Sequence, residues 1–326
     1  MGKASRTKQA PDRRARIAAQ REAERRAAMV KRIWLAGGAI FAVVIVVVAL
    51  VLVNLNKGSG TAPVASDGPT GAALSTLTKQ VTGVPTATTD KVAAGGVPAQ
   101  ILVSAHTSSE VQSATSNLGS FFANVSGASL TANGKPEILY IGAEYCPYCA
   151  AQRWAMINSL SRFGTFTGLT TTHSSTSDVY PDTPTWTFYG SKYSSPYITF
   201  TSVETTTNER QGNSSSSTVP YVTLQTPTAA QTTLWESYSP NGTIPFINLG
   251  GKYIQEGNLY PLNPSMLQKL TWQQVAADMN NPNSSVGKAL IGNANVMTAA
   301  ICNLTGNKPA TACTSTIQAL ESQLPK

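Results

Sequence analysis

An uninterrupted apolar run, IWLAGGAIFAVVIVVVALVLV, occupies residues 33–53 of this 326-residue chain. Its 21 residues carry no charge. As a helix rising about 1.5 Å per residue, the run would span roughly the 30 Å hydrocarbon core of a bilayer. A cleaved signal peptide is the alternative, but the run is longer than a typical signal core and no small-residue cleavage pattern closely follows it. The sequence therefore predicts a retained transmembrane signal anchor.

Basic residues are concentrated before this run. Residues 1–32 hold 11 of the 24 Lys and Arg residues but only 3 of the 16 Asp and Glu residues, which leaves 13 of each sign in the rest of the chain. Lys and Arg gather on the cytoplasmic flank of membrane helices. We therefore expect a basic cytoplasmic tail, the lipid bilayer as partner of residues 33–53, and a cell-membrane protein whose C-terminal domain is extracytoplasmic. No aromatic residue lies among the basic residues before Trp34, so a nucleic-acid partner is not expected.

Few large apolar side chains occur in residues 54–98, where Gly, Pro, Ser, Thr and Ala predominate. Such a segment buries too little surface to offset the entropy lost on ordering. It is predicted to be a flexible linker, with a short helix near residues 72–80 as an alternative. Residues 99–326 are then the extracytoplasmic domain.

Short apolar segments and helical spacings predict that this domain is α/β. Residues 138–141 (ILYI) are apolar on both faces, which is typical of a buried central strand. Apolar residues then recur at helical spacing at Ala150, Trp154, Ile157 and Leu160. The Thr-, Ser- and Tyr-rich residues 165–240 predict a β-rich insertion, and residues 264–323 a helical C-terminal extension. Strands within the insertion are predicted near residues 166–171, 185–189 and 197–203.

Two cysteines three positions apart, Cys146 and Cys149, fall where the strand gives way to the helix. Zinc would need two further ligands at matching spacing, and His106 and His173 are isolated, so no metal or other cofactor is expected. Free N–H groups and the positive dipole end at a helix start stabilise a thiolate. Pro147 fits the first helical turn, where its missing N–H costs nothing. We therefore interpret Cys146 as an exposed, reactive thiol and Cys149, one turn deeper, as the resolving thiol.

The sequence EILYIGAEYCPYC, followed by an amphipathic helix, resembles the active-site strand and helix of the thioredoxin superfamily. Its Pro147–Tyr148 dipeptide is the one found in glutaredoxins and in extracytoplasmic disulfide oxidoreductases of the Dsb type. The second mark of the superfamily is a cis-proline before a strand, and GTIPFINLGGKY supplies Ile244–Pro245 ahead of a strand, a Gly-Gly turn and a second strand. The resemblance implies that Pro245 lies opposite the cysteines and that the backbone of Ile244 offers its N–H and C=O to a substrate peptide.

Residues 140–166 and 179–200 together are similar to a family of membrane-anchored proteins catalogued only as a domain of unknown function. This narrower resemblance covers roughly residues 95–325, and it implies the anchor and the fold but no substrate. Pro245 lies 99 positions after Cys146, farther than in a simple thioredoxin core, and no tryptophan directly precedes the first cysteine. Because of these departures from the thioredoxin superfamily, the substrates and redox potentials of its members are not assigned to this chain.

Cys302 and Cys313 flank a Gly-Asn-Lys-Pro turn between two helical patterns. A structural disulfide there would close a short loop and add about 2–3 kcal/mol in the chain-entropy model. The alternative is a second dithiol that passes electrons to Cys146 and Cys149. The structural disulfide is favoured, because neither residue belongs to a C-x-x-C pair at a helix start.

Together these features predict a single-pass membrane protein whose outer domain has a thioredoxin-like central sheet with flanking helices. It is expected to act as a thiol–disulfide oxidoreductase of the oxidase or isomerase type. The expected partners are cysteine-containing envelope or secreted proteins, with a redox partner in the membrane as a further candidate. Two alternatives stay open: a non-catalytic envelope binding protein that keeps Cys146–Cys149 as a stable disulfide, and a carrier of copper or another soft metal.

Overall fold

The chain is described by a computed structural model that covers residues 68–95, 102–104, 122–125, 127–255 and 262–324. All of these residues belong to one compact unit, Pro63–Lys326. The predicted cytoplasmic tail (1–32) and membrane anchor (33–53) fall outside the described residues. Among the residues that are described, no helix is long and apolar enough to cross a membrane.

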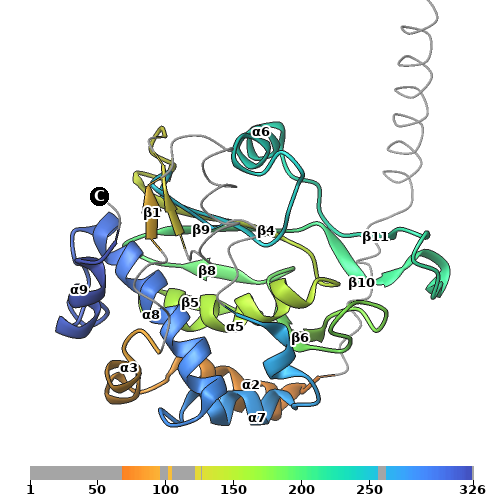
Figure 1. The fold of residues 1–326 in the computed structure, drawn as a ribbon, viewed down its shortest axis with the longest axis horizontal. Helices are drawn as coiled ribbons and strands as arrows, with labels where there is room; N and C mark the ends of the chain where they lie inside the picture. Colours follow the sequence, from red (N-terminus) through yellow and green to blue (C-terminus); the bar gives the residue numbers. More distant parts are fainter. Residues whose placement is uncertain (1–67, 96–101, 105–121, 126, 256–261, 325–326) are drawn as a thin grey trace, which may run out of the picture. The chain divides into compact units, whose positions relative to one another are not determined.

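The domain mixes short strands with helices (Figure 1). The strands are β1 (Leu102–Ser104), β2 (Phe122–Asn124), β3 (Thr131–Ala132), β4 (Lys135–Gly142), β5 (Thr165–Thr167), β6 (Thr170–His173), β7 (Pro184–Thr187), β8 (Lys192–Ser194), β9 (Thr199–Glu204), β10 (Thr206–Arg210), β11 (Tyr221–Thr223), β12 (Phe246–Leu249) and β13 (Tyr253–Gln255). The helices are α2 (Gly71–Thr82), α3 (Thr86–Val92), α5 (Pro147–Ser161), α6 (Ala229–Tyr238), α7 (Trp272–Met279), α8 (Ser285–Thr305) and α9 (Ser315–Glu321), with short 3-10 turns at Gln211–Asn213 and Pro264–Leu267. Local sequence explains several helix starts: α6 and α7 begin with reciprocal Thr–Gln capping boxes, at Thr228 and Thr271.

The main sheet is built around β4. This strand pairs in parallel with β9 and antiparallel with β12, and the sheet continues from β12 through β13 and β2 to β1. The strand predicted at residues 138–141 is confirmed as a buried part of β4. Gly250 and Gly251, in the turn between β12 and β13, have positive φ angles of 63° and 75°, which glycine adopts without a Cβ clash.

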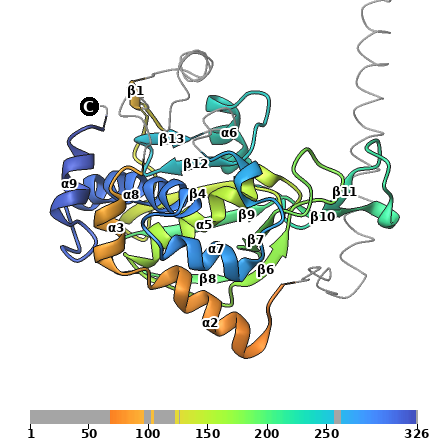
Figure 2. The same ribbon diagram turned by 60° about the horizontal axis from the view of Figure 1, so that its bottom comes forward.

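Helices cover both faces of this sheet (Figures 1 and 2). Because successive strand residues point to opposite faces, Ile138 and Tyr140 enter the larger core with α5, α7 and α8, whereas Leu139 and Ile141 enter a smaller core against α6. Helix α5 is buried along almost its whole length, and α8 packs beside it. Trp154 of α5, one of the apolar residues whose spacing predicted this helix, is fully buried.

The predicted insertion, residues 165–240, is rich in short strands, as expected, and it contains β9, which also belongs to the main sheet. β5 pairs with β8, β6 with β7 and β10 with β11, each as an antiparallel two-stranded sheet. The insertion is joined to the main sheet by an aromatic cluster in which neighbouring ring centroids lie 4.8–5.9 Å apart: Phe166, Phe188, Tyr193 and Phe200. Since Phe200 belongs to β9, this cluster holds the insertion against the sheet.

The flexible-linker prediction for residues 54–98 is wrong for its second half, where α2 and α3 form. Leu77 and Val81 of α2 are buried in the larger core, and Asn158 Nδ2 of α5 donates to the Val81 carbonyl oxygen across 2.9 Å. Leu74, Leu77 and Val81 form an apolar stripe at helical spacing. The composition around them is otherwise typical of a linker. The folded domain therefore includes α2, and the predicted start near residue 99 is too late.

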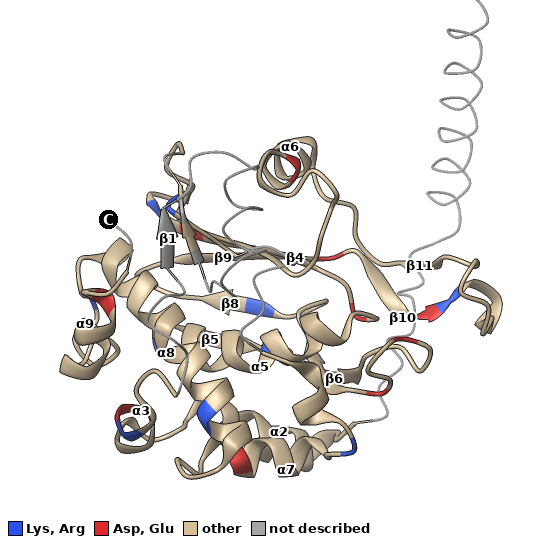
Figure 3. Ribbon diagram, viewed as in Figure 1, with Lys and Arg blue, Asp and Glu red and all other residues tan. Residues whose placement is uncertain are grey.

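Charged residues are sparse in the described part of the chain. Figure 3 shows Lys and Arg scattered among Asp and Glu over several elements. The distribution agrees with the equal numbers of basic and acidic residues after residue 32.

Replacing Leu77 with Ala tests whether α2 belongs to the domain. Truncating a buried leucine typically costs about 2–5 kcal/mol, so we expect Leu77→Ala to lower the free energy of unfolding by about 3 kcal/mol. The exposed change Lys79→Ala in the same helix should alter it by less than about 0.5 kcal/mol. The measurement is chemical unfolding of the full-length chain. Equally small effects of the two changes would mean that α2 is not part of the cooperative unit.

Candidate active site

The dithiol lies where the chain leaves β4 and enters α5. Cys146 is the last residue before the helix and has an extended backbone (φ −76°, ψ 119°), and Pro147 is the first helical residue, as predicted. Cys149 is fully buried and Cys146 is only 6% exposed. The prediction that Cys146 is exposed is therefore wrong. The start of α5 and the segment before β12 cover nearly all of its surface.

Both cysteines are free thiols in this structure, and Cys149 N donates to Cys146 Sγ across 3.4 Å. Burial alone would raise the pKa of Cys146. Hydrogen bonds from the thiol and backbone of Cys149, together with the charge of Arg153, outweigh burial and lower that pKa below its ordinary value. The pKa of Cys149 is raised well above its ordinary value, first by burial and then by its thiol hydrogen bond to Cys146. The site thus favours a thiolate on Cys146 and a proton on Cys149.

The segment before β12 forms the other side of the dithiol. The Cys146 thiol lies 4.0 Å from the Ile244 carbonyl oxygen, and the Ile244–Pro245 peptide bond is cis. Phe246 pairs with Ile141 across β12 and β4, which sets the preceding residues beside the end of β4. Cys146 and Ile244, 98 positions apart in the sequence, therefore lie together where β4 ends and β12 begins.

Tyrosine side chains surround the start of α5. The ring of Tyr148, the partly exposed second residue of the helix, meets Tyr180 of the insertion at a centroid distance of 5.9 Å. Tyr145, which precedes the dithiol, stacks on Tyr221 with centroids 4.2 Å apart and rings 3° from parallel. Both contacts tie the dithiol segment to the insertion.

A fully buried ion pair lies one helical turn beyond the dithiol. Arg153 donates from Nε and Nη2 to the two carboxylate oxygens of Glu204, at 2.8 and 2.7 Å. Its Nη2 also donates to the Ala143 carbonyl oxygen at 2.7 Å, just after β4. Both charged side chains are 0% exposed, and buried charges persist only when paired and hydrogen-bonded. The pair therefore fixes the ends of β4 and β9 against α5 and keeps a positive group near the thiols.

Glu144, two residues before Cys146, is a second buried acid. Among the described residues, neither of its carboxylate oxygens has a partner in good hydrogen-bond geometry. Burial raises the pKa of Glu144 to about 7, although the nearby Thr187 hydroxyl and the charge of Arg153 favour the ionised form. A group that gains or loses a proton near neutral pH therefore adjoins the dithiol segment.

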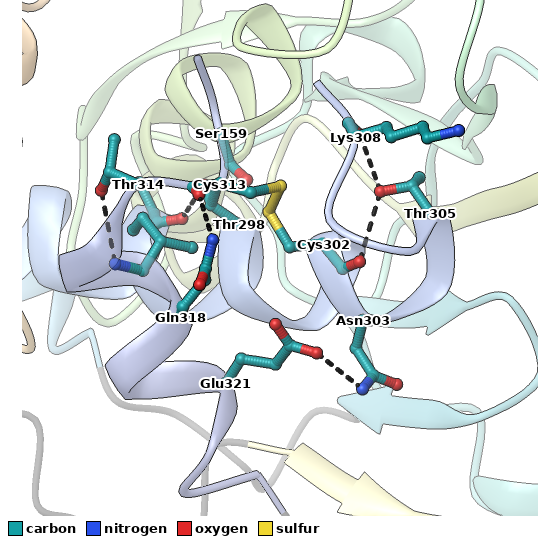
Figure 4. Close-up of a disulfide and its surroundings, with 12 residues drawn as sticks. Ser159, Thr298, Cys302, Asn303, Thr305, Lys308, Cys313, Thr314, Gln318 and Glu321 are labelled. Carbon is teal, nitrogen blue, oxygen red and sulfur yellow. Dashed lines mark hydrogen bonds between the residues drawn. A yellow bond between two sulfur atoms is a disulfide. The ribbon is translucent and has the colours of Figure 1, made fainter. Parts of the chain in front are cut away.

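Cys302 and Cys313 are joined in a disulfide between the end of α8 and the loop before α9 (Figure 4). Both residues are buried, and their Cα atoms are 5.8 Å apart, within the usual range. Gln318 Nε2 donates to the Cys313 carbonyl oxygen (2.9 Å) and Thr305 Oγ1 to that of Cys302 (3.3 Å), so hydrogen bonds hold both ends as well.

The position of this disulfide favours a structural role over an electron relay. Thr298, one turn before Cys302, lies 3.0 Å from Ser159 between their hydroxyl oxygens. Ser159 comes ten positions after Cys149 on α5, which is about 15 Å along a helix. Thiol exchange needs contact between sulfur atoms, so direct exchange between the two pairs would require a large rearrangement.

The fold and the site define a mixed α/β domain that carries a buried dithiol at a strand–helix junction. The family described as "Domain of unknown function (DUF929)" matches residues 121–303, more than half of the chain, and the chain belongs to that family. Searches of curated proteins and of solved structures found no match. Within the described residues, no group of three or more His, Cys, Asp or Glu side chains is arranged to hold a metal ion.

Three residues of the site carry little signal in the sequence: Glu144, Arg153 and Glu204. Charged residues are normally exposed, so none of them stands out as buried. One indication exists in hindsight, because Arg153 follows Cys149 by four positions and therefore shares its helix face. Glu204, 51 positions after Arg153, has no such indication.

The raised pKa of Glu144 predicts how stability depends on pH. Between the ordinary glutamate value of about 4.3 and the folded value of about 7, only folded Glu144 keeps its proton. Unfolding then releases a proton, so stability falls as pH rises through this window and the loss is complete above it. Glutamine cannot ionise, so the Glu144→Gln variant does not lose stability in this way. We expect its free energy of unfolding to exceed that of the parent by about 3 kcal/mol at pH 8, and this difference to vanish near pH 4.3.

Chemical unfolding of both proteins at pH 5 and pH 8 measures this difference. Glu236→Gln, a matched change at an exposed carboxyl of α6, is the control. A stability difference between the Glu144→Gln variant and the parent that is the same at both pH values would contradict the assignment of a protonated Glu144.

Proposed function

We propose that the chain is a membrane-anchored, extracytoplasmic thiol–disulfide oxidoreductase. The observation that carries this proposal is the geometry of the dithiol: Cys146 precedes the first residue of α5, and Cys149 N donates to Cys146 Sγ across 3.4 Å. The lowered pKa of Cys146 and the raised pKa of Cys149 agree with it. Thiol–disulfide exchange needs a nucleophilic thiolate and a second thiol within reach to resolve the mixed disulfide. The two cysteines meet both requirements.

The strand arrangement supports a thioredoxin-like core for this domain. β4 leads into the dithiol helix, β9 lies parallel to β4 on one side, and β12 lies antiparallel on the other side, followed by β13. The two segments through which the sequence resembles the thioredoxin superfamily are thus neighbouring strands of one sheet. In this proposal, the β-rich insertion and the C-terminal helices are additions to that core.

The reaction proceeds by two exchanges at sulfur. The Cys146 thiolate attacks a partner disulfide, an S–S bond forms between Cys146 and one partner sulfur, and the other partner sulfur leaves as a thiolate. Cys149 then loses its proton and attacks Cys146 Sγ, which forms the Cys146–Cys149 disulfide and releases the first partner sulfur. The dithiol gives two electrons to the partner disulfide, the single proton of Cys149 passes to one partner sulfur, and the other partner sulfur leaves as a thiolate that takes its proton from water. The same steps in reverse oxidise a partner dithiol.

The segment before β12 has a positioning role in this scheme. The Ile244 carbonyl oxygen, 4.0 Å from the Cys146 thiol, can accept an N–H from an extended partner segment. Pro245 has no backbone N–H, so it offers no competing donor beside the sulfurs. A partner strand held there would bring its cysteine to Cys146.

We assign the reaction to the outside of the cell membrane because of the basic residues 1–32 and the apolar run at residues 33–53. Disulfides persist in that compartment. Oxidation or isomerisation of cysteine-containing envelope or secreted proteins is therefore favoured, since net reduction would need electrons supplied from the cytoplasm. A redox partner in the membrane would restore the starting state of the dithiol, and no cofactor is required.

Removing the resolving thiol tests the proposal directly. The Cys149→Ser variant of the full-length chain, expressed in its own cell envelope, should accumulate mixed disulfides through Cys146, visible as high-mass bands that reductant removes. Adding Cys146→Ser should abolish the bands, whereas removing Cys302 and Cys313 together should leave them. A Cys149→Ser protein that folds and traps no partner would instead support the non-catalytic binding alternative.

A further inference from the structure

A polar pocket of about 290 Å³ lies in the β-rich insertion. It is formed where the end of β6 and its following loop meet the end of β10 and its following loop (Figure 1). Its lining includes His173, Ser175 and Ser177 from the first part and Asn208, Arg210 and Ser215 from the second.

A direct hydrogen bond connects this pocket to the dithiol segment. Ser175 N donates to the Tyr145 carbonyl oxygen across 2.9 Å, and Tyr145 immediately precedes Cys146. The ring of Tyr145 stacks on Tyr221, and the guanidinium of Arg210 lies 4.1 Å from the centroid of that same ring. The pocket wall and the dithiol segment are therefore packed as one unit.

The pocket is lined by polar groups and by two side chains of opposite charge. Arg210 donates from Nη1 to the Val219 carbonyl oxygen at 2.6 Å and from Nη2 to the Tyr221 hydroxyl at 3.0 Å. Glu209, of opposite charge, lines the same pocket. The remaining groups are largely hydroxyls and amides, which donate and accept hydrogen bonds without a net charge. This lining suits peptide and hydroxyl groups better than a phosphate or a carboxylate.

Asn208 indicates what the pocket would hold. Its side chain is only 5% exposed, and Nδ2 donates to the His173 carbonyl oxygen across 3.0 Å. Its Oδ1 is also buried, and no donor to it is found in the described parts of the chain. A buried acceptor without a donor is unfavourable. An N–H group that enters the pocket would be stabilised at this oxygen once the Asn208 side chain turns toward it.

We propose that this pocket is a substrate subsite that holds a neutral polar segment of the partner polypeptide beside its reactive cysteine, with a partner N–H donating to Asn208 Oδ1. The inference rests on the thiol–disulfide exchange proposed above and names its substrate class, which is proteins whose reactive cysteine is flanked by small polar residues such as Ser, Thr, Asn or Gly. The volume, at the lower end of the roughly 300–1,000 Å³ of small-molecule pockets, fits small residues rather than a large cofactor. The subsite belongs to the insertion and is separate from the Ile244 carbonyl.

The test compares two peptides that differ only beside their single cysteine, with Ser, Thr and Asn in one and Leu in the other. Each is presented to the reduced full-length chain as a mixed disulfide with the same small chromogenic thiol. Bis(2-hydroxyethyl) disulfide serves as a substrate too small to use the pocket. We expect the polar peptide to react about tenfold faster than the leucine peptide, the factor that 1.4 kcal/mol of differential binding supplies.

Two neighbouring serines provide matched variants, because Ser215 lines the pocket and Ser216, which is also exposed, is not part of its lining. Ser215→Trp fills the pocket and should abolish the preference for the polar peptide, with little change in the rate for bis(2-hydroxyethyl) disulfide. Ser216→Trp should keep the preference. If Ser215→Trp also slows the small disulfide, Ser177→Leu repeats the test from the other loop.

The outcomes separate the two proposals. Equal rates for the two peptides in the parent protein, or a preference that survives both pocket-filling changes, would overturn the subsite while leaving the exchange reaction intact. Failure of the parent to exchange with either peptide or with bis(2-hydroxyethyl) disulfide would overturn the proposed function, and the subsite with it.

Discussion

The sulfur of Cys146 receives hydrogen bonds from the backbone and the thiol of Cys149 in a site from which water is almost excluded. A thiolate persists in such surroundings only where fixed donors replace the lost water. These donors exist because α5 begins at Pro147, directly after the residues that leave β4. β4 is in turn held between β9 and β12, and α5 is packed against α8. The charge on one sulfur atom therefore depends on the central strand and the core helix together.

Buried ionisable groups set a second constraint on the same region. Arg153 and Glu204 compensate each other, and Arg153 favours the ionised forms of both Cys146 and Glu144. Two negative charges that share one positive neighbour oppose each other's formation in a low-dielectric interior. Burial, and after it the charge of Glu204, raise the pKa of Glu144 to about 7, so this carboxyl is largely protonated below neutral pH.

Short-range patterns in the sequence were sufficient to predict β4, α5 and the dithiol at their junction. The resemblance to the thioredoxin superfamily also implied that Ile244 and Pro245 lie beside Cys146, as they do. Long-range packing was not predictable in the same way. The burial of Glu144 and the pairing of Arg153 with Glu204 depend on contacts between distant segments, and a charged residue carries no sign of its future burial. For α2, a linker-like composition masked an apolar helical stripe.

The central claim is that Cys146 carries the thiolate and Cys149 the proton, and the pH dependence of alkylation measures this directly. The reduced full-length chain would be labelled with a small alkylating agent over a range of pH, and each cysteine quantified by mass spectrometry, with the Cys146→Ser variant as control. Labelling of Cys146 should rise with a midpoint below the ordinary thiol pKa of about 8.5, while Cys149 stays unlabelled until far higher pH. Labelling of both cysteines with a common midpoint at or above that value, or of Cys149 first, would contradict the account.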